Sequence, residues 1–572
     1  MPGISELSAI NQGENTGTMA MSARGRCDRP SGRVAARLLS VCLVAAFFVV
    51  SLTVAFFHPP HEDFKLLVAQ YVLLLPALLI WLWNAEPSNM PPIRTPNLAI
   101  LSALFLILAL GIATWIRLPT TGDESSYRFQ ARLLVSSRLT TEAPPATVPI
   151  TFNHHSMTSG KWYSKYPPGW PLILAVGTRA GFDWAVNALM GLVILGITYG
   201  IGREVFGPPI GRLAVVLMIL SPFFVLHCTG FFSHPSCGVF IAGATYGAIA
   251  ALRSPSIWAA VASFACLAAA FMVRPFTAFC AGMVLGFWLL WNLRSNPRRI
   301  AAIVGIASVA GIAALGLSIS YNRALTGIDS VLMYGEAAAH LALNAQGVLE
   351  GLNSTRSSLQ STLLYAFPFA FLIAGYAVMR ERQHRSEVLL LISIFIALVI
   401  AHVVETWHIG PRYGERYYLE AYFAVAIVAA RGLYLLRDRF PHIGRRDLLA
   451  ASCVLFFVQV FYFATGVEDA LAKVRPWNHI QTALNQIEVT NAVAFIRVNG
   501  AQLTARDFNV NAPDWRSARL FVMEDVGTTT RRASVACSLD RTAWVLIGYD
   551  EQSDTVQRVE EHEANCNPML DS

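Results

Sequence analysis

The stretch "LAVVLMILSPFFVLHCTGFFSHPSCGVFIAGATYGAIAAL", from Leu213 to Leu252, contains no Asp, Glu, Lys or Arg and lies between Arg212 and Arg253. A membrane-crossing helix needs about 20 apolar residues, so this stretch predicts two crossings joined by a tight turn. Of the 572 residues in the chain, 55% are apolar and 14% charged, and the mean hydropathy is +0.48. In soluble domains about a quarter of the residues are charged. The sequence therefore predicts a polytopic α-helical membrane protein.

The same apolar pattern recurs along the chain and predicts about 13 membrane spans. The polar head, residues 1–37, is basic and is expected to be disordered and cytoplasmic. We interpret the next apolar run as an uncleaved first span, because no convincing small-residue cleavage site follows it before His58. The spans are expected near residues 38–57, 66–84, 97–116, 185–205, 213–231, 238–252, 257–273, 276–293, 300–320, 361–379, 387–404, 416–436 and 447–465.

Arginines test the orientation, because loops on the cytoplasmic side carry an excess of basic residues. If the N-terminus is inside, every second loop is cytoplasmic. These loops hold Arg94, Arg203, Arg212, Arg253, Arg294, Arg298, Arg299, Arg380, Arg382, Arg385 and the basic run 437–446. The pattern predicts a cytoplasmic N-terminus and an extracytoplasmic C-terminus, with the bacterial inner membrane as the expected location.

Three outward segments are too long to be simple turns, namely residues 118–184, 321–360 and 466–572. The first two are expected as outer loops of a transmembrane domain that spans 38–465. The last has the composition of a soluble domain and contains the short strand-like runs "NAVAFIRV", "ARLFVMED" and "TAWVLIGYDE". It is therefore expected to be a small α/β domain. Its two cysteines, Cys537 and Cys566, are candidates for a disulfide on an oxidising side of the membrane.

The first outer segment opens with "GDESSYRFQARLL", from Gly122 to Leu134, and continues with "GKWYSKYPPGWPL", from Gly160 to Leu172. An Asp-Glu pair at a helix start has a structural interpretation, because acids stabilise helix N-termini. It also suits general-base chemistry, in which a carboxylate takes a proton from an attacking hydroxyl group. Both interpretations stay open at this point.

These motifs resemble the first outer loop of GT-C glycosyltransferases, in the branch of protein O-mannosyltransferases and aminoarabinose transferases. Four further stretches look like signatures of that family, and all fall on the predicted outer side: "SHP" at 233–235, "VRPFTA" at 273–278, "YNRALTG" at 321–327 and "GERYYLEAYFAVAIVAARGL" at 414–433. There are two departures. Ser126 stands where aminoarabinose transferases have Arg, so the resemblance does not carry over an arabinose-type donor. Tyr166 separates Lys165 from the proline pair, whereas those enzymes have Lys directly before it.

The resemblance implies a GT-C-like fold and transfer of a sugar from a polyprenyl-phosphate donor to an extracytoplasmic hydroxyl group on a glycan, lipid or protein. Asp123 and Glu124 are then the candidate catalytic residues, with Asp123 as the base of an inverting displacement. Cations are expected to hold the phosphate. The candidates are Lys165, Arg274, Arg416 and Arg412. The candidates for substrate contact are Tyr127, Tyr166, His234 and Tyr417.

Each candidate also has a structural interpretation. Arg274 could extend to the membrane interface, Lys165 could contact lipid head groups, and Arg416 could pair with Glu415 or Glu420. The rival functions are a lipid flippase or transporter, an oligosaccharide polymerase or ligase, and a non-catalytic assembly protein. No cofactor is firmly predicted, no zinc-type cluster is apparent, and an Asp-Glu pair could hold Mg²⁺ or Mn²⁺. The sugar, the acceptor and the oligomeric state are not predicted.

Overall fold

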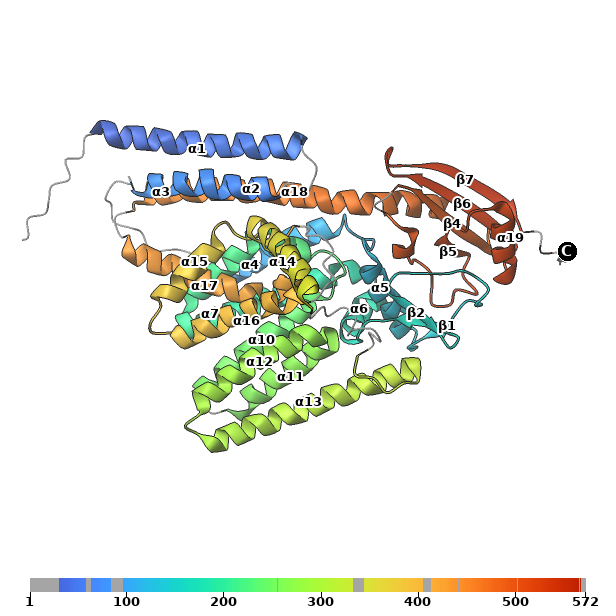
Figure 1. The fold of residues 1–572 in the computed structure, drawn as a ribbon, viewed down its shortest axis with the longest axis horizontal. Helices are drawn as coiled ribbons and strands as arrows, with labels where there is room; N and C mark the ends of the chain where they lie inside the picture. The colour runs from blue at the N-terminus through green and yellow to red at the C-terminus, as the bar shows by residue number, and fades with distance from the viewer. Residues whose placement is uncertain are drawn as a thin grey trace, which may run out of the picture.

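The computed structural model describes residues 30–57, 63–83, 96–254, 256–332, 344–404, 413–440, 443–500, 503–564 and 566. A helical bundle fills one part of the molecule, and a four-stranded sheet stands beyond one end of it (Figure 1). The bundle helices are α1 (Pro30–Phe57), α2 (Asp63–Ala69), α3 (Leu75–Trp83), α4 (Leu98–Ala113), α7 (Val186–Phe206), α8 (Pro208–Ile219), α9 (Pro222–His227), α10 (His234–Arg253), α11 (Ile257–Val273), α12 (Pro275–Leu293), α13 (Pro297–Thr326), α14 (Ala345–Tyr365), α15 (Ala370–Arg380), α16 (Arg385–Val403), α17 (Leu419–Arg439) and α18 (Arg445–Gln486).

The prediction of a polytopic helical membrane protein is confirmed. Within the described residues, nine helices are long and apolar enough to cross a membrane, a bent pair adds up to one more, and three shorter apolar helices accompany them. Helix α17 is buried along most of its length and forms the centre of the bundle, whereas α1 and α13 expose many large apolar side chains. Such exposed apolar surface suits contact with lipid.

Two predicted spans are not single straight helices. The span near 213–231 is divided into α8 and α9, because Ser221 caps the new helix and Pro222 lacks the amide that would continue the old one. The span near 361–379 is divided into α14 and α15, which meet at 95°. Pro368 disfavours helical backbone at the residue before it, and Phe369 adopts a left-handed conformation with φ of 61°. Helix α14 begins at Ala345, within the segment 321–360 that is expected as the second outer loop.

The first outer segment is folded and lies between the bundle and the sheet (Figure 1). It contains α5 (Gly122–Val135), β1 (Thr141–Glu142), β2 (His155–Thr158), β3 (Lys161–Ser164), α6 (Gly169–Ala180) and the 3₁₀ turn η2 (Asp183–Ala185). The three strands form an antiparallel sheet in the order β1-β3-β2.

The C-terminal α/β domain is confirmed. Its elements are β4 (Ala492–Asn499), η5 (Ala505–Asp507), β5 (Leu520–Glu524), α19 (Thr529–Ser538), β6 (Ala543–Asp550) and β7 (Thr555–Glu563), with strand order β5-β4-β6-β7. Strand β4 runs parallel to both neighbours, and β7 is antiparallel to β6. The last predicted span, near 447–465, is only the first half of α18, which continues as one helix to Gln486 and reaches the sheet.

Both faces of this sheet are covered, which explains the nearly continuous apolar sequence of β4. Val493 and Phe495 pack with Phe129 and Trp162 of the first outer segment. The alternate residues of β4, Ala494 and Ile496, pack on the side of α18. The sheet domain therefore shares one apolar core with the outer segment that carries the Asp-Glu pair.

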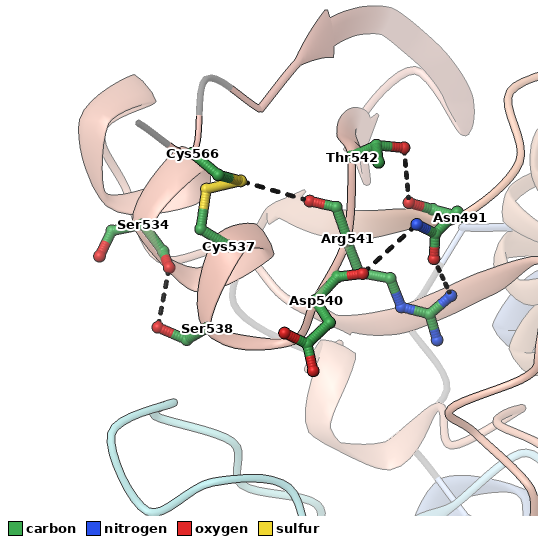
Figure 2. The surroundings of a disulfide bond; sticks show 8 residues. All are labelled: Asn491, Ser534, Cys537, Ser538, Asp540, Arg541, Thr542 and Cys566. Atoms are coloured by element: carbon green, nitrogen blue, oxygen red, sulfur yellow. Dashed lines mark hydrogen bonds between the residues drawn. A yellow bond between two sulfur atoms is a disulfide. The ribbon is translucent and has the colours of Figure 1, made fainter. Parts of the chain in front are cut away.

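The structure joins Cys537 and Cys566 by a disulfide, shown in Figure 2. Cys537 lies near the end of α19, and Cys566 follows β7. The bond closes a loop over a sequence separation of 29 residues. It ties the end of the described chain to the helix that links β5 and β6.

Candidate functional site

Helix α5 begins at the acidic pair, and its first turn is buried. The Thr121 side chain accepts a hydrogen bond from the Glu124 amide, and two acids in the first turn suit the positive end of a helix. However, Asp123 is only 6% exposed and Glu124 only 1%. A solvated pair that simply caps a surface helix would not be buried in this way. Buried carboxylates require partners.

Asp123 has three polar neighbours, which come from three different segments. The Tyr166 hydroxyl, which precedes α6, donates to Oδ1 of Asp123. His154 Nε2 lies 3.4 Å from the same oxygen. Arg416 Nη2 lies 3.3 Å from Oδ2 and comes from η4 (Arg416–Tyr418), just before α17. Residues separated by as many as 293 positions thus converge on one carboxylate.

Glu124 faces a different set of groups. Its Oε2 accepts hydrogen bonds from the amide and the hydroxyl of Thr120, both at 2.7 Å. Its Oε1 accepts from the Phe231 amide, also at 2.7 Å. Burial raises the pKa of Glu124, and these hydrogen bonds act in the opposite direction. The contacts connect the start of α5 to the loop before α10, and we therefore propose that Glu124 supports the site rather than acting as a catalytic group.

The two arginines that were predicted to hold phosphate both lie close to one aromatic ring. The guanidinium carbon of Arg274 is 4.8 Å from the centre of the Tyr417 ring, and that of Arg416 is 5.4 Å from it. Arg416 also lies 4.4 Å from the Phe232 ring. Cations over aromatic faces are favourable, and the ring also keeps the guanidinium planes in place.

Glu420, on the first turn of α17, holds the second arginine. It is fully buried, and Oε1 lies 2.7 Å from Arg274 Nε and 2.8 Å from His234 Nδ1. His234 also meets the Tyr417 ring edge-on at 5.1 Å. Each of the two arginines therefore has an acidic partner. Arg416 contacts Asp123, and Arg274 contacts Glu420.

Tyr127 and Tyr166 pack together beside Asp123, with ring centres 4.5 Å apart. Tyr127 Oη is 3.2 Å from Ser233 Oγ, which lies at the start of α10. Burial raises the pKa of Tyr127, so its hydroxyl stays protonated at neutral pH. Lys165 is adjacent, with Nζ 5.9 Å from the Tyr166 ring centre. These predicted residues therefore belong to the same cluster, whereas Arg412 lies outside the described residues.

The contacts of the Asp-Glu pair bear on whether it could hold a divalent metal. Mg²⁺ and Mn²⁺ prefer several oxygen ligands around one point. Asp123 instead faces an arginine and a histidine, and Glu124 faces two backbone amides and a hydroxyl. Within the part of the chain that the structure describes, no group of three or more His, Cys, Asp or Glu residues could hold a metal ion.

Sequence reasoning missed His154 as a neighbour of Asp123. His154 has a left-handed backbone with φ of 63°, which is uncommon for a residue other than glycine. The available signal was the pair of adjacent histidines in "FNHHS" within the same outer segment. The sequence suggests Glu420 as a partner for Arg416, and no pattern in it indicates that Glu420 contacts both His234 and Arg274.

Comparisons with known proteins agree with the predicted fold. Residues 167–317 match the family model for dolichyl-phosphate-mannose-protein mannosyltransferases. The structure of ArnT from Cupriavidus metallidurans bound to undecaprenyl phosphate is similar over 78% of this chain and 92% of its own, at 14% identity and a TM-score of 0.50. An Archaeoglobus fulgidus oligosaccharyltransferase in the apo form is similar over 79% of this chain and 69% of its own, at 12% identity and a TM-score of 0.45. No protein of curated function matches the chain.

Proposed function

From the GT-C glycosyltransferase fold that the chain carries, which confirms the predicted resemblance, we propose that it is a membrane glycosyltransferase. It transfers a sugar from a polyprenyl-phosphate donor to an acceptor hydroxyl group by inverting displacement. One observation carries the proposal: Asp123 is buried beside a pair of arginines that share the Tyr417 ring. This cluster places a candidate base next to candidate phosphate ligands.

The polar contacts of Asp123 suggest which of its atoms would act as the base. A carboxylate has about four lone-pair positions. Tyr166 and His154 face Oδ1, whereas Arg416 is the one donor to Oδ2 among the described residues. Oδ2 therefore keeps a lone pair for the acceptor hydroxyl. A carboxylate in hydrogen-bond reach of such a proton contributes about 10²–10⁴-fold to the rate.

The cations supply the other half of the reaction. The donor carries a phosphate diester that leaves as a phosphate monoester, so negative charge grows on the leaving oxygen. Arg274, Arg416 and Lys165 provide positive charge around the same cluster. A guanidinium has five N–H donors, so one carboxylate contact does not exhaust its capacity. We therefore assign the arginines to donor binding and Lys165 to the surrounding positive charge.

The chemical step balances without a cofactor. The acceptor oxygen attacks the anomeric carbon from the side opposite the phosphate, and its proton passes to Asp123. The bond between the anomeric carbon and the phosphate oxygen breaks, and polyprenyl phosphate leaves with the electron pair. Attack from the opposite face inverts the configuration of the sugar. His234 and Tyr417 act indirectly, because both contact Arg274 or its partner Glu420.

The orientation in the membrane is part of the proposal. The arginine distribution supports an N-terminus in the cytoplasm and a cluster on the extracytoplasmic side of a bacterial inner membrane. On that side the donor would present its head group, while the polyprenyl tail lies among the helices. The acceptor, whether glycan, lipid or protein, would approach from the extracytoplasmic side.

A direct test uses the purified full-length chain and a panel of radiolabelled polyprenyl-phosphate sugars. We expect release of polyprenyl phosphate together with sugar transfer or donor hydrolysis for at least one donor. The same preparation, placed in liposomes, is scored for movement of intact donor across the bilayer. Movement without any turnover would contradict the proposal and favour the flippase. Joining of lipid-linked oligosaccharides without use of any monosaccharide donor would favour a polymerase or ligase.

A further inference from the structure

The C-terminal sheet domain touches the loop that carries His154 on both sides of that residue. The Asn153 amide donates to the Arg506 carbonyl at 3.0 Å, and the Asn153 side chain donates to Asp507 Oδ1 at 2.7 Å. On the other side, His155 Nε2 and Asn509 Nδ2 are 2.9 Å apart. Arg506 and Asp507 belong to η5, and Asn509 follows it closely. The segment 153–155 is therefore held between η5 and its own outer segment.

His154 is fixed further by the elements around the acidic pair. Its carbonyl accepts hydrogen bonds from Ser126 Oγ at 2.7 Å and from the Lys165 amide at 3.2 Å. Its Nε2 faces Asp123 Oδ1 at 3.4 Å. Burial lowers the pKa of His154, which leaves the ring neutral at pH 7. A carboxylate only accepts hydrogen bonds, so this geometry favours the tautomer in which Nε2 carries the proton.

Gly122 allows the sheet domain to come this close. A Cβ atom at that position would lie 2.6 Å from Asp507 Oδ1 and 2.7 Å from Asn153 Cβ. Both distances are too short for any side chain larger than hydrogen. Asp507 thus lies against the first turn of α5, one residue before Asp123. The contact joins the sheet domain to the proposed reaction centre rather than to a remote surface.

We propose that His154 is a positioning residue for Asp123 and that the C-terminal sheet domain, through Asp507 and Asn153, holds His154 in place. The inference rests on the proposed function of Asp123. His154 and Tyr166 together direct Oδ1 away from the acceptor and leave Oδ2 to act as the base. The sheet domain therefore contributes to catalysis by keeping His154, and through it Asp123, in position.

The first test compares substitutions of His154 in the full-length protein. We expect His154→Ala to lower kcat at least about tenfold with donor KM unchanged within about twofold, because the base loses its orientation while the arginines remain. His154→Gln should restore kcat to within about threefold of wild type, since its amide nitrogen can donate from nearly the same position. His154→Asn, which tolerates the left-handed backbone but is shorter, should be as slow as His154→Ala. Wild-type kcat in the alanine and asparagine variants, or no recovery in the glutamine variant, would overturn the role of His154.

The second test asks whether the sheet domain restrains the loop that carries His154. It measures hydrogen–deuterium exchange and does not require an active enzyme. Asp507→Ala removes the oxygen that accepts the hydrogen bond from the Asn153 side chain, whereas Asp507→Asn keeps an oxygen at that place. The matched control is Asp514→Asn, because Asp514 is exposed. We expect faster hydrogen–deuterium exchange across residues 152–158 in Asp507→Ala alone, with kcat reduced several-fold in that variant. Unchanged exchange in Asp507→Ala would overturn the claim that Asp507 restrains this loop. If wild-type protein transfers no sugar from any donor, the proposed function fails, and the exchange result still decides whether Asp507 holds this loop.

Discussion

Replacing Glu124 by Gln separates a supporting role from a catalytic one. The carboxylate accepts three hydrogen bonds at 2.7 Å, from the Thr120 amide and hydroxyl and from the Phe231 amide. Glutamine offers one oxygen and one NH₂ group in the same space. In either orientation of the amide, the NH₂ group faces a backbone N–H that needs an acceptor. At least one buried donor therefore loses its partner.

The expected loss of stability follows from the number of hydrogen bonds that the glutamine cannot accept. An unsatisfied buried donor costs about 1–3 kcal/mol, and hydrogen bonds to a charged acceptor are worth about 1.5–3 kcal/mol each. We therefore expect Glu124→Gln to lower the free energy of unfolding by about 2–4 kcal/mol, measured by thermal unfolding of the protein in detergent. Glu142→Gln is the matched control, because Glu142 pairs with Arg516 at the exposed surface, and its unfolding temperature should not change.

Activity completes the test. Well below its unfolding temperature, the Glu124→Gln protein should keep turnover within about tenfold of wild type, because Asp123 retains its own contacts. Unchanged stability combined with a loss of turnover above about 100-fold would refute the supporting role and return Glu124 to catalysis.

Three further outcomes follow from the structure. Glu420→Gln should weaken donor binding at least about tenfold and lower stability by about 3 kcal/mol, because Arg274 loses its buried partner; donor binding and unfolding at wild-type values would contradict this arrangement. Non-reducing mass spectrometry should find Cys537 joined to Cys566, a bond worth a few kcal/mol in the chain-entropy model, and two alkylatable thiols would rule it out. Single-cysteine labelling should place residues 118–184 and 466–572 on the face opposite Arg298, and a cytoplasmic sheet domain would reverse the proposed orientation.

The membrane fold could be predicted because its signal is local. Charge-free runs such as 213–252 give the helices directly, and short apolar runs such as 491–498 give the strands of the small domain. The breaks between α8 and α9 and between α14 and α15 were harder to predict, because the sequence is apolar on both sides of Ser221 and of Pro368. The length of α18 was missed for the opposite reason, because the helix continues past Gly466 and Pro476, two residues that disfavour a helix interior.

The candidate site could be predicted only in part. The sequence placed Asp123, Arg274 and Arg416 on one predicted side of the membrane, and the structure brings these segments together around Tyr417. Which arginine pairs with which acid depends on how α10, α12 and α17 pack, and no local pattern records that. The contact between Asp507 and Asn153 spans 354 residues and crosses from the sheet domain to the outer segment. Such a contact has no signature in a single sequence.

The central claim is that the Asp123 carboxylate is the base, and one comparison of turnover tests it most directly. The purified full-length wild type, Asp123→Asn and Asp183→Asn are assayed with the same labelled donor, and donor binding is measured separately. Asp183 is a suitable control because it also pairs with an arginine, Arg128, at 2.8 Å, but does not contact Asp123 in the described structure. We expect Asp123→Asn to bind donor and to lose at least about 100-fold in turnover, or roughly 3 kcal/mol of barrier, while Asp183→Asn stays near wild type. Sugar transfer at the wild-type rate by Asp123→Asn would contradict the mechanism.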